Sequence, residues 1–255
     1  RLILCGDHFQ LPAVVKSMVA KKGGLDHTML DRCMEFKECV SLLNRQYRMS
    51  NAIMGFSNSY FYNGELQSDE SVSEQVLWSS EEFFLNRNIE FIDTAGCNFE
   101  EVQNPETLSY FNPGEGRILL AHLQQLLEHY SAVSEATPIS IGVISPYKEQ
   151  REWLSDNIAV NTQDFPLLQS LSVKTIDGFQ GEERDVIYIS LVRSNAVGEI
   201  GFLNDLRRMN VAITRARKKL VVLGDSATIG NAAFYRSFLE YCEKHGAYRT
   251  AWEWA

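Results

Sequence analysis

The chain has 255 residues, of which 45% are hydrophobic and 22% charged, a balance that excludes a disordered or fibrous protein. A formal net charge of −9 argues against a general basic coat for nucleic acid, although a local phosphate-binding groove depends only on where Lys and Arg lie. The apolar runs fall short of the ~18 residues that a membrane span needs. Five cysteines without a CxxC pair indicate a reduced, intracellular protein.

Short β-rich runs alternate with helical patterns along the chain. Strands are predicted at residues 1–5, 39–43, 89–93, 139–145, 170–175, 185–192 and 219–223. Helices are predicted at residues 25–34, 50–62, 113–130, 148–158, 203–216 and 232–243. Residues 64–88 and 94–112 are polar and irregular, which indicates surface insertions. Because several strands are rich in Val, Ile and Leu, the sequence predicts a doubly wound α/β fold with a mostly parallel sheet covered on both faces.

The first polar segment follows the first predicted strand. Gly6 and Asp7 end an apolar run, and Gln10 stands in the next loop before Pro12 turns the chain. The carboxyl ends of strands are where open α/β sheets place their ligands. A neutral amide there is able to hydrogen-bond a phosphate oxygen or an attacking water without adding charge. The simpler interpretation is an ordinary exit from a strand.

The second segment, Gln46-Tyr47-Arg48-Met49, leads into the predicted helix 50–62, with Ser50 as its expected N-cap. Arg48 therefore stands just before a helix N-terminus, where backbone N–H groups favour anions. Its guanidinium adds a fixed fork that matches phosphate geometry. The simpler interpretation is a solvated arginine paired with a surface carboxylate.

The third segment connects two apolar strands over residues 174–185. Gly178 and Gly181 bracket Phe179-Gln180 and allow tight turns and close approach of the backbone to a ligand. Thr175 and Glu183 add a hydroxyl and a carboxylate to the same connector. Connectors with this many polar groups usually carry function, and the alternative is a charged crossover.

The fourth segment, residues 207–217, has an apolar helical stripe. On a helical wheel Arg208 and Arg215 fall within roughly 20° of each other on the opposite face, and neither has an acidic partner at i+4. Two stacked cations are poor for helix stability alone, so they favour an anion that arrives from outside. The alternative is a solvated basic face.

In their order and spacing these segments resemble motifs III, IV, V and VI of superfamily 1 helicases, in the branch of the nonsense-mediated-decay helicase and the replication helicase–nuclease. Ser145-Pro146-Tyr147-x-x-Gln150 matches that branch too, and the resemblance extends from residue 1 to about residue 226. The four segments that carry it are Gly6-Asp7-x-x-Gln10-Leu11-Pro12, Gln46-Tyr47-Arg48-Met49, Asp177-Gly178-Phe179-Gln180-Gly181-x-Glu183 and Val211-Ala212-Ile213-Thr214-Arg215-Ala216-Arg217.

The resemblance implies two RecA-like domains of the P-loop NTPase type, with ATP between them and single-stranded DNA or RNA across their top. Residues 1–36 would be the C-terminal remnant of the first domain, and residues 37–255 the second domain. It implies that Gln10 senses the γ-phosphate or its attacking water, that Arg48 and Arg215 contact the γ-phosphate, and that Glu183 lies near the ribose. Other implied nucleotide-binding residues are Gly6, Asp7 and Gly181, and the implied nucleic-acid contacts are Ser145, Pro146, Tyr147, Thr175 and Ser194.

Two family elements are absent from the sequence. No G-x-x-x-x-G-K-[ST] occurs, and no apolar strand ends in Asp-Glu. The phosphate loop and the Mg²⁺ ligands are therefore expected upstream of Arg1, which is not a methionine, in a longer protein whose first RecA-like domain is the partner of this chain. Ala13 also stands where many relatives have a second proline. We expect that the chain alone binds ATP poorly, hydrolyses none, and holds no metal ion.

Three alternatives remain. The first is a non-catalytic, helicase-like docking module for nucleic acid or a protein. Such a module would have no physical need for Gln10, Arg48, Glu183 and Arg215 together. The run Asp93-Thr94-Ala95-Gly96 is similar to a small-GTPase switch element but lacks that family's phosphate loop, so a turn after a strand is the simpler interpretation. Cys242-x-x-His245 with His122 and His129 suggests a metal site, although the helical spacing around Cys242 favours core packing. The resemblance suggests 5′-to-3′ movement and leaves DNA and RNA undistinguished.

Overall fold

Six parallel strands form the central sheet of the computed structural model, which describes residues 2–11, 15, 17–78, 86–133, 136–158 and 164–254. The spatial order of the strands is β10-β3-β9-β8-β6-β7, and every neighbouring pair is parallel. These strands are β3 (Ile89–Asp93), β6 (Ile139–Ser145), β7 (Leu168–Thr175), β8 (Arg184–Ser190), β9 (Ala216–Gly224) and β10 (Tyr248–Thr250).

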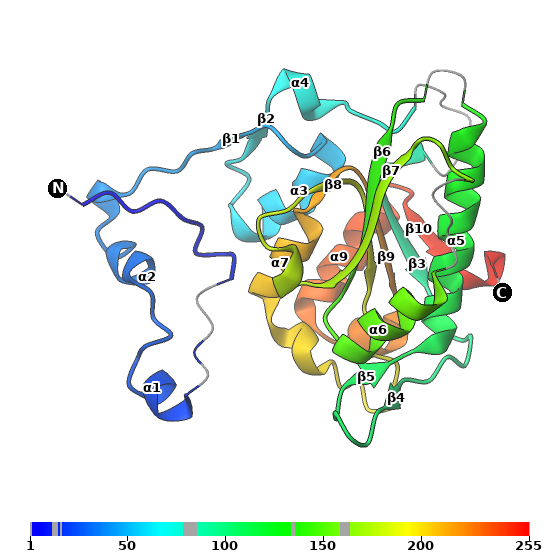
Figure 1. Ribbon diagram of the computed structural model, residues 1–255. Coiled ribbons are helices and arrows are strands. Elements are labelled where there is room, and N and C mark those ends of the chain that lie inside the picture. Colours follow the sequence, from blue (N-terminus) through cyan, green and yellow to red (C-terminus); the bar gives the residue numbers. More distant parts are fainter. Residues whose placement is uncertain are drawn as a thin grey trace.

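Helices and short strands connect the sheet (Figure 1). The helices are α1 (Met18–Lys22), α2 (Met29–Cys33), α3 (Asn51–Phe61), α4 (Glu70–Ser73), α5 (Pro113–Ser131), α6 (Lys148–Asn157), α7 (Leu206–Ile213), α8 (Ser226–Ile229) and α9 (Ala233–Lys244). The 3-10 turns are η1 (Lys37–Cys39), η3 (Asp177–Phe179), η4 (Gly201–Asn204) and η5 (Ala251–Glu253), and the short strands are β1 (Arg45–Gln46), β2 (Gln67–Ser68), β4 (Val102–Gln103) and β5 (Tyr110–Phe111).

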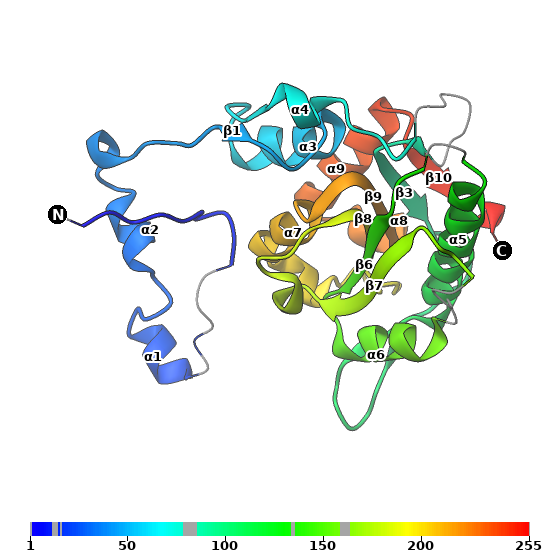
Figure 2. The ribbon, with the colours of Figure 1, turned by 45° about the horizontal axis from the view of Figure 1, so that its top comes forward.

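Helices cover both faces of the sheet, as Figures 1 and 2 show. One face packs against α3, α7 and α9, and the other against α5 and α6. Side chains of a strand alternate between faces, so Ile187 and Ile189 of β8 enter the first core while Val186 and Tyr188 enter the second. Burial on both faces explains the unbroken apolar sequence of this central strand and confirms the doubly wound, mostly parallel α/β fold.

The predicted strands of the sheet are confirmed, with shifts at some ends. β3 and β6 have the predicted bounds, β7 begins two residues earlier, and β9 extends the prediction at both ends. β8 ends two residues before the prediction at Ser190, because the chain turns sharply at Val192, whose φ of 74° is left-handed. The three residues of β10 carry no strand prediction, since so short an edge strand has no periodicity to detect.

The N-terminal arm, formed by the described part of residues 2–44, lies beside the sheet (Figure 2), and both strand predictions in it are wrong. Residues 2–5 and 40–43 have no strand structure, and their apolar side chains are exposed, Ile3 at 85% and Leu43 at 87%. A β-rich run becomes a strand only beside a pairing partner, and no described strand pairs with either run. Arg1, Pro12 and Ala13 lie outside the described residues.

The helix predictions divide into two groups. The helices at 50–62, 113–130, 148–158 and 232–243 are confirmed with ends that shift by at most one residue. The prediction at 25–34 shortens to α2, and the prediction at 203–216 is replaced by η4 and α7, which ends at Ile213. Ser50 is the N-cap residue of α3, as predicted, but its buried hydroxyl makes no hydrogen bond there.

The two predicted insertions are more ordered than their sequences indicate. The described part of 64–88 contains β2 and α4 and buries Leu77 and Trp78, whereas residues 79–85 lie outside the described residues. The segment 94–112 contains the antiparallel pair β4–β5. Burial of two large apolar side chains shows that part of the first insertion belongs to the core.

Two of the alternative interpretations, the switch element at residues 93–96 and the metal site around Cys242, find ordinary structural explanations. Asp93 begins a turn after β3, where its carboxylate accepts from the N–H groups of Ala95 and Ser226. Cys242 is buried in the core, and His122 Nδ1 lies 2.7 Å from the hydroxyl oxygen of Tyr188. Within the described ranges no group of three or more metal-ligating side chains gathers.

None of the helices among the described residues combines the length and the apolar character that crossing a membrane requires.

Candidate functional site

Arg215 lies buried at the amino end of β9, directly after α7, with 3% of the residue exposed. Its Nε donates to the carbonyl oxygen of Val211 at 3.0 Å, and its Nη1 to that of Glu182 at 3.4 Å. Its Nη2 donates to Gln10 Oε1 and to the hydroxyl of Thr214, both at 3.3 Å. All four acceptors are uncharged, and no carboxylate of the described residues forms an ion pair with this guanidinium.

Burial, with a further contribution from the charge of Arg48, lowers the pKa of Arg215 to about 10. The side chain therefore remains a cation at neutral pH. The carboxylates of Glu183 and Asp7 partly offset the cost of this buried charge without forming an ion pair with it, so an anion that reached the guanidinium would be stabilised. This arrangement favours the binding of an external anion.

Arg48 reaches the same place from the segment before α3. Its Nε donates to Glu183 Oε2 at 2.5 Å, and its Nη1 to the carbonyl oxygen of Thr214 at 3.1 Å. The Gln46 side chain closes the turn behind it, because Gln46 Oε1 accepts from the N–H groups of Arg48 and Met49, both at 2.8 Å. Arg48 is thus partly exposed and paired with a surface carboxylate, as its simpler interpretation expects, and it lies beside Arg215 because both side chains contact Thr214.

Gln10 joins the site from the N-terminal arm. Its Nε2 donates to Asp7 Oδ2 at 2.9 Å, which leaves Oε1 for Arg215. Asp7 Oδ2 also accepts from the Tyr62 hydroxyl at 2.6 Å, and Asn210 donates to the Phe9 carbonyl at 3.0 Å. Burial and the bond to Asp7 raise the pKa of Tyr62. Tyr62 and Asn210, which fix the arm against α3 and α7, carry no site prediction because their pairing spans 55 and 201 residues.

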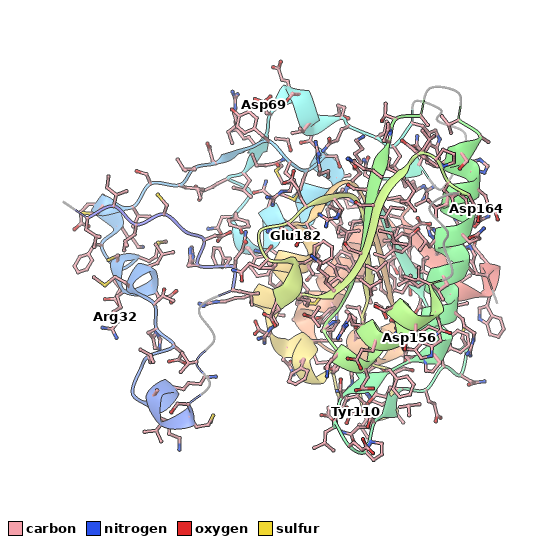
Figure 3. The ribbon with its side chains drawn as sticks, in the orientation of Figure 1. Arg32, Asp69, Tyr110, Asp156, Asp164 and Glu182 are labelled. Atoms are coloured by element: carbon pink, nitrogen blue, oxygen red, sulfur yellow. The ribbon has the colours of Figure 1, made fainter. Side chains whose placement is uncertain are left out.

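The structure brings together most of the predicted nucleotide residues. Glu183 lies at the amino end of β8, next to Arg215, and its carboxylate also lies 3.8 Å from Arg217 Nε. Gly181 is exposed in the preceding loop with a φ of 83°, a conformation that favours glycine. Figure 3 labels Glu182 on that loop, on the side of the sheet that faces the arm. Gly6 is exposed, and as a glycine it has no side chain that could contact a ligand.

The predicted pairing of Arg208 with Arg215 on one helix face is wrong. Arg208 lies on α7, where its Nη1 donates to Asp205 Oδ2 at 2.8 Å and its Nε lies 3.5 Å from Asp177 Oδ1. Arg215 lies beyond the end of that helix and turns into the protein. The helical wheel fails here because it continues past the residue at which the helix stops.

The predicted nucleic-acid residues lie at the opposite end of the sheet, at the carboxyl ends of β6, β7 and β8. Ser145 and Thr175 are register partners on β6 and β7. Ser145 and Tyr147 are buried, with the Ser145 hydroxyl accepting from the Tyr147 N–H at 3.2 Å, whereas Thr175 and Pro146 are partly exposed. The Thr175 hydroxyl accepts from the N–H of Gly178 at 3.4 Å.

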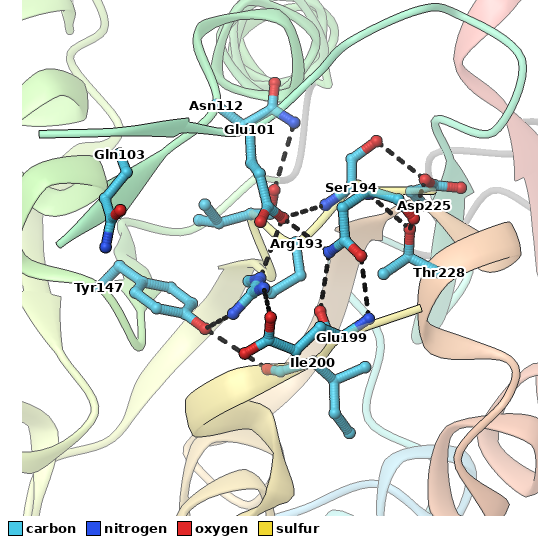
Figure 4. A network of polar contacts seen from close by, with 12 residues as sticks. Glu101, Gln103, Asn112, Tyr147, Arg193, Ser194, Glu199, Ile200, Asp225 and Thr228 are labelled. Atoms are coloured by element: carbon cyan, nitrogen blue, oxygen red, sulfur yellow. Dashed lines mark hydrogen bonds and ion pairs between the residues drawn. The ribbon is translucent and has the colours of Figure 1, made fainter. Parts of the chain in front are cut away.

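Ser194 follows β8 at the same end, and two carboxylates occupy its donors (Figure 4). Its N–H donates to Glu101 Oε2 at 2.7 Å and its hydroxyl to Asp225 Oδ2 at 2.8 Å. Glu101 Oε2 also accepts from Arg193 Nε at 2.9 Å and Asn195 Nδ2 at 3.2 Å. Sequence reasoning missed Glu101, which comes from an insertion without a motif.

A buried carboxyl group holds the strained turn before Ser194. Glu115 on α5 accepts from the hydroxyl of Ser190 at 2.5 Å and from the N–H of Val192 at 3.0 Å. Val192 is β-branched and has a left-handed φ of 74°, a conformation that costs about 1–3 kcal/mol and persists only where surrounding contacts hold it. Glu115 therefore positions the carboxyl end of β8.

We predict that Glu115 makes stability fall as pH rises. Burial raises the pKa of Glu115 to about 8, so between the unfolded pKa of 4.5 and pH 8 the folded state holds a proton that the unfolded state has lost. The free energy of unfolding should drop by about 2 kcal/mol from pH 6 to pH 8. Urea unfolding should show this fall in stability with pH in the unsubstituted protein and in Glu128→Gln, an exposed control on the same helix. Glu115→Gln should not show it. Equal slopes in all three proteins would refute the assignment.

A six-stranded parallel sheet covered by helices on both faces has the architecture of a RecA-like α/β domain. A family model described as an AAA domain matches residues 25–227. The chain belongs to this AAA-domain family, and its relatives include helicases.

Three relatives illustrate the similarity. The chain is 36% identical over 262 residues to the DNA-binding protein SMUBP-2 of Mus musculus, covering 100% of this chain and 25% of that protein. It is 36% identical over 268 residues to the DNA polymerase alpha-associated DNA helicase A of Saccharomyces cerevisiae, covering 98% and 38%. It is 32% identical over 246 residues to a regulator of nonsense transcripts 1 homolog of Arabidopsis thaliana, covering 96% and 19%. The chain thus spans well under half of each relative.

Proposed function

We propose that the chain is the C-terminal half of an ATP-dependent helicase or translocase that acts on single-stranded nucleic acid. Residues 1–36 would form the C-terminal end of the first RecA-like domain, and residues 37–255 would form the second. We use the term complete helicase for the longer protein that joins this chain to an upstream phosphate loop and upstream Mg²⁺ ligands. The single observation that carries the proposal is the buried, positively charged Arg215, which has only neutral acceptors.

In this proposal the anion is the γ-phosphate of ATP. Arg215 and Arg48 would contact it from the second domain, Gln10 would orient it or the attacking water, and Glu183 would lie near the ribose. Arginines that reach a transferring phosphoryl group from a separate domain stabilise the charge of the transition state. They also make hydrolysis depend on closure of the two domains, which converts ATP turnover into movement.

The partner that completes the cleft would be the first RecA-like domain. Exposed apolar side chains along the arm, such as Ile3 and Leu43, support a protein partner on this segment. At the other end of the sheet, Thr175 and Pro146 would line the single-strand track above Ser145 and Tyr147. Ser194 would join the track only after exchanging its carboxylate partners. All five cysteines are free thiols, which suits the intracellular location that belongs to this proposal.

The proposal is tested by comparing two proteins for ATP hydrolysis. The 255-residue chain alone should release no phosphate with or without oligothymidylate or oligouridylate, because it lacks the phosphate loop. The complete helicase should hydrolyse ATP, and single-stranded oligonucleotide should stimulate it. Stimulated turnover by the isolated chain would contradict the assignment of the phosphate loop to an upstream domain. Absence of hydrolysis in the complete helicase would favour a docking module.

A further inference from the structure

An exposed aromatic ring lies at the carboxyl end of the sheet, on the turn η4 between β8 and α7. Ile200 and Leu203 of this turn are buried, whereas Phe202 between them is 63% exposed. The turn therefore presents one large apolar side chain to solvent and anchors itself with its neighbours. None of the four helicase motifs contains this residue.

Two tyrosine hydroxyl groups anchor this turn by hydrogen bonds to its backbone. The Tyr147 hydroxyl donates to the carbonyl oxygen of Ile200 at 3.4 Å, and the Tyr235 hydroxyl to that of Leu203 at 2.9 Å. Gly201 has a φ of 54°, and a Cβ atom at this position would lie 2.3 Å from Arg193 Nη1. A left-handed φ favours glycine, and the absence of a side chain lets η4 lie directly against the Arg193 guanidinium.

Phe202 rests on an aromatic residue of the proposed nucleic-acid track. Its ring centroid lies 5.5 Å from that of Tyr147, with 36° between the ring planes. Tyr147 is buried beneath it, and its N–H donates to Ser145 at the carboxyl end of β6. Tyr110 meets Tyr147 edge-on, with centroids 5.9 Å apart. The exposed ring thus stands on a preorganised aromatic platform beside Ser145.

The charge around this platform favours a neutral ligand over a phosphate. Glu101 and Glu199 lie 2.9 and 3.7 Å from nitrogens of Arg193, so two carboxylates accompany one cation. Asp225 adds a third carboxylate next to Ser194 (Figure 4). The one cation at this platform is therefore already paired, so a phosphate finds no free positive charge here, whereas the exposed ring offers a flat face to a base.

We propose that Phe202 stacks on a base of the single strand as it passes the carboxyl end of the sheet. The inference rests on the proposed helicase function and names one contact within it. Aromatic side chains bind single strands without sequence preference, because every base offers a flat face. A duplex keeps its bases stacked on one another, so the contact selects single-stranded nucleic acid.

The test uses binding of fluorescein-labelled oligothymidylate to the complete helicase without ATP, followed by fluorescence anisotropy. Phe202→Ala should weaken binding about tenfold, and Phe202→Trp should bind at least as tightly as the parent. Phe202→Leu should resemble Phe202→Ala, because leucine keeps apolar area but has no aromatic face. The slope of affinity against salt should not change, since no phosphate contact is lost. The control Trp252→Ala removes an aromatic side chain of similar exposure, 62%, and should leave affinity unchanged.

The outcomes separate this inference from the helicase proposal. If the parent protein does not bind oligothymidylate, the proposed function itself fails. If the parent binds and Phe202→Ala binds equally well, only the stacking inference is overturned. Parental affinity in Phe202→Leu would also overturn it, because the ring would then act as an apolar cover for another protein segment. The inference is supported if Phe202→Ala and Phe202→Leu both bind more weakly than the parent while Trp252→Ala does not.

Discussion

Arg215→Ala in the complete helicase should lower ATP hydrolysis by about 10³-fold or more while the protein stays folded. The proposed γ-phosphate contact explains the loss, because the guanidinium supplies charge where the transition state develops it. The fold should persist because Arg215 makes only neutral hydrogen bonds, and its removal takes a buried charge out of the domain. Phosphate release at saturating single-stranded oligonucleotide measures the effect, and the thermal melting curve checks the fold.

A matched control separates this effect from the loss of any arginine. Arg236 on α9 donates to the carbonyl oxygens of Gly230 and Asn231, away from the site, and Arg236→Ala should hydrolyse ATP at the parental rate. Arg215→Lys should remain strongly impaired, because lysine keeps the charge but lacks the planar fork. A folded Arg215→Ala protein with turnover within tenfold of the parent would show that Arg215 does not act on the transferring phosphoryl group.

Lys219→Met should destabilise the domain by about 3 kcal/mol, because it leaves a buried carboxylate without its ion pair. Lys219 Nζ lies 2.8 Å from Glu90 Oε2, and both residues are fully buried on the neighbouring strands β9 and β3. Burial alone would raise the pKa of Glu90, but Lys219 and His122 hold it at about 2. Without Lys219 the carboxylate keeps only His122 Nε2 at 3.4 Å and Arg249 Nη1 at 3.8 Å.

Urea unfolding at pH 7 measures this loss, and a second variant tests its cause. The double variant Lys219→Met with Glu90→Gln should recover most of the stability, because no unpaired charge then remains in the core. If the double variant is as unstable as Lys219→Met alone, lost packing of the lysine side chain explains the effect and the ion pair does not.

The fold was predictable where burial leaves a pattern in the sequence. The central strands β6 and β8 are apolar on both faces, so their composition alone identifies them. The runs at 2–5 and 40–43 have the same composition but no pairing partner among the described strands, and composition carries no information on pairing. Three-residue β10 is too short to show a period. Helix predictions failed mainly at their ends, as at Ile213, where the fourth segment leaves its helix before Arg215.

The site was predictable as a set of residues but not as a network. Gln10, Arg48 and Arg215 emerge from short segments whose order resembles helicase motifs, and their contacts agree with convergence on one place. Their supports are long-range pairs, such as Asp7 with Tyr62 and Glu101 with Arg193, that join residues 55 and 92 positions apart. No local pattern encodes such a pair. For the same reason the buried state of Ser145 and Tyr147 follows only from the folded chain.

Discrimination between ATP and ADP tests the proposed γ-phosphate contact most directly. Fluorescent derivatives of ADP and of a non-hydrolysable ATP analogue are to be titrated into the complete helicase and into Arg215→Ala, with Mg²⁺ present. Our proposal predicts that the variant binds the triphosphate at least tenfold more weakly and binds ADP within twofold of the parent, since ADP lacks the γ-phosphate. Equal weakening of both nucleotides, or of neither, would contradict it.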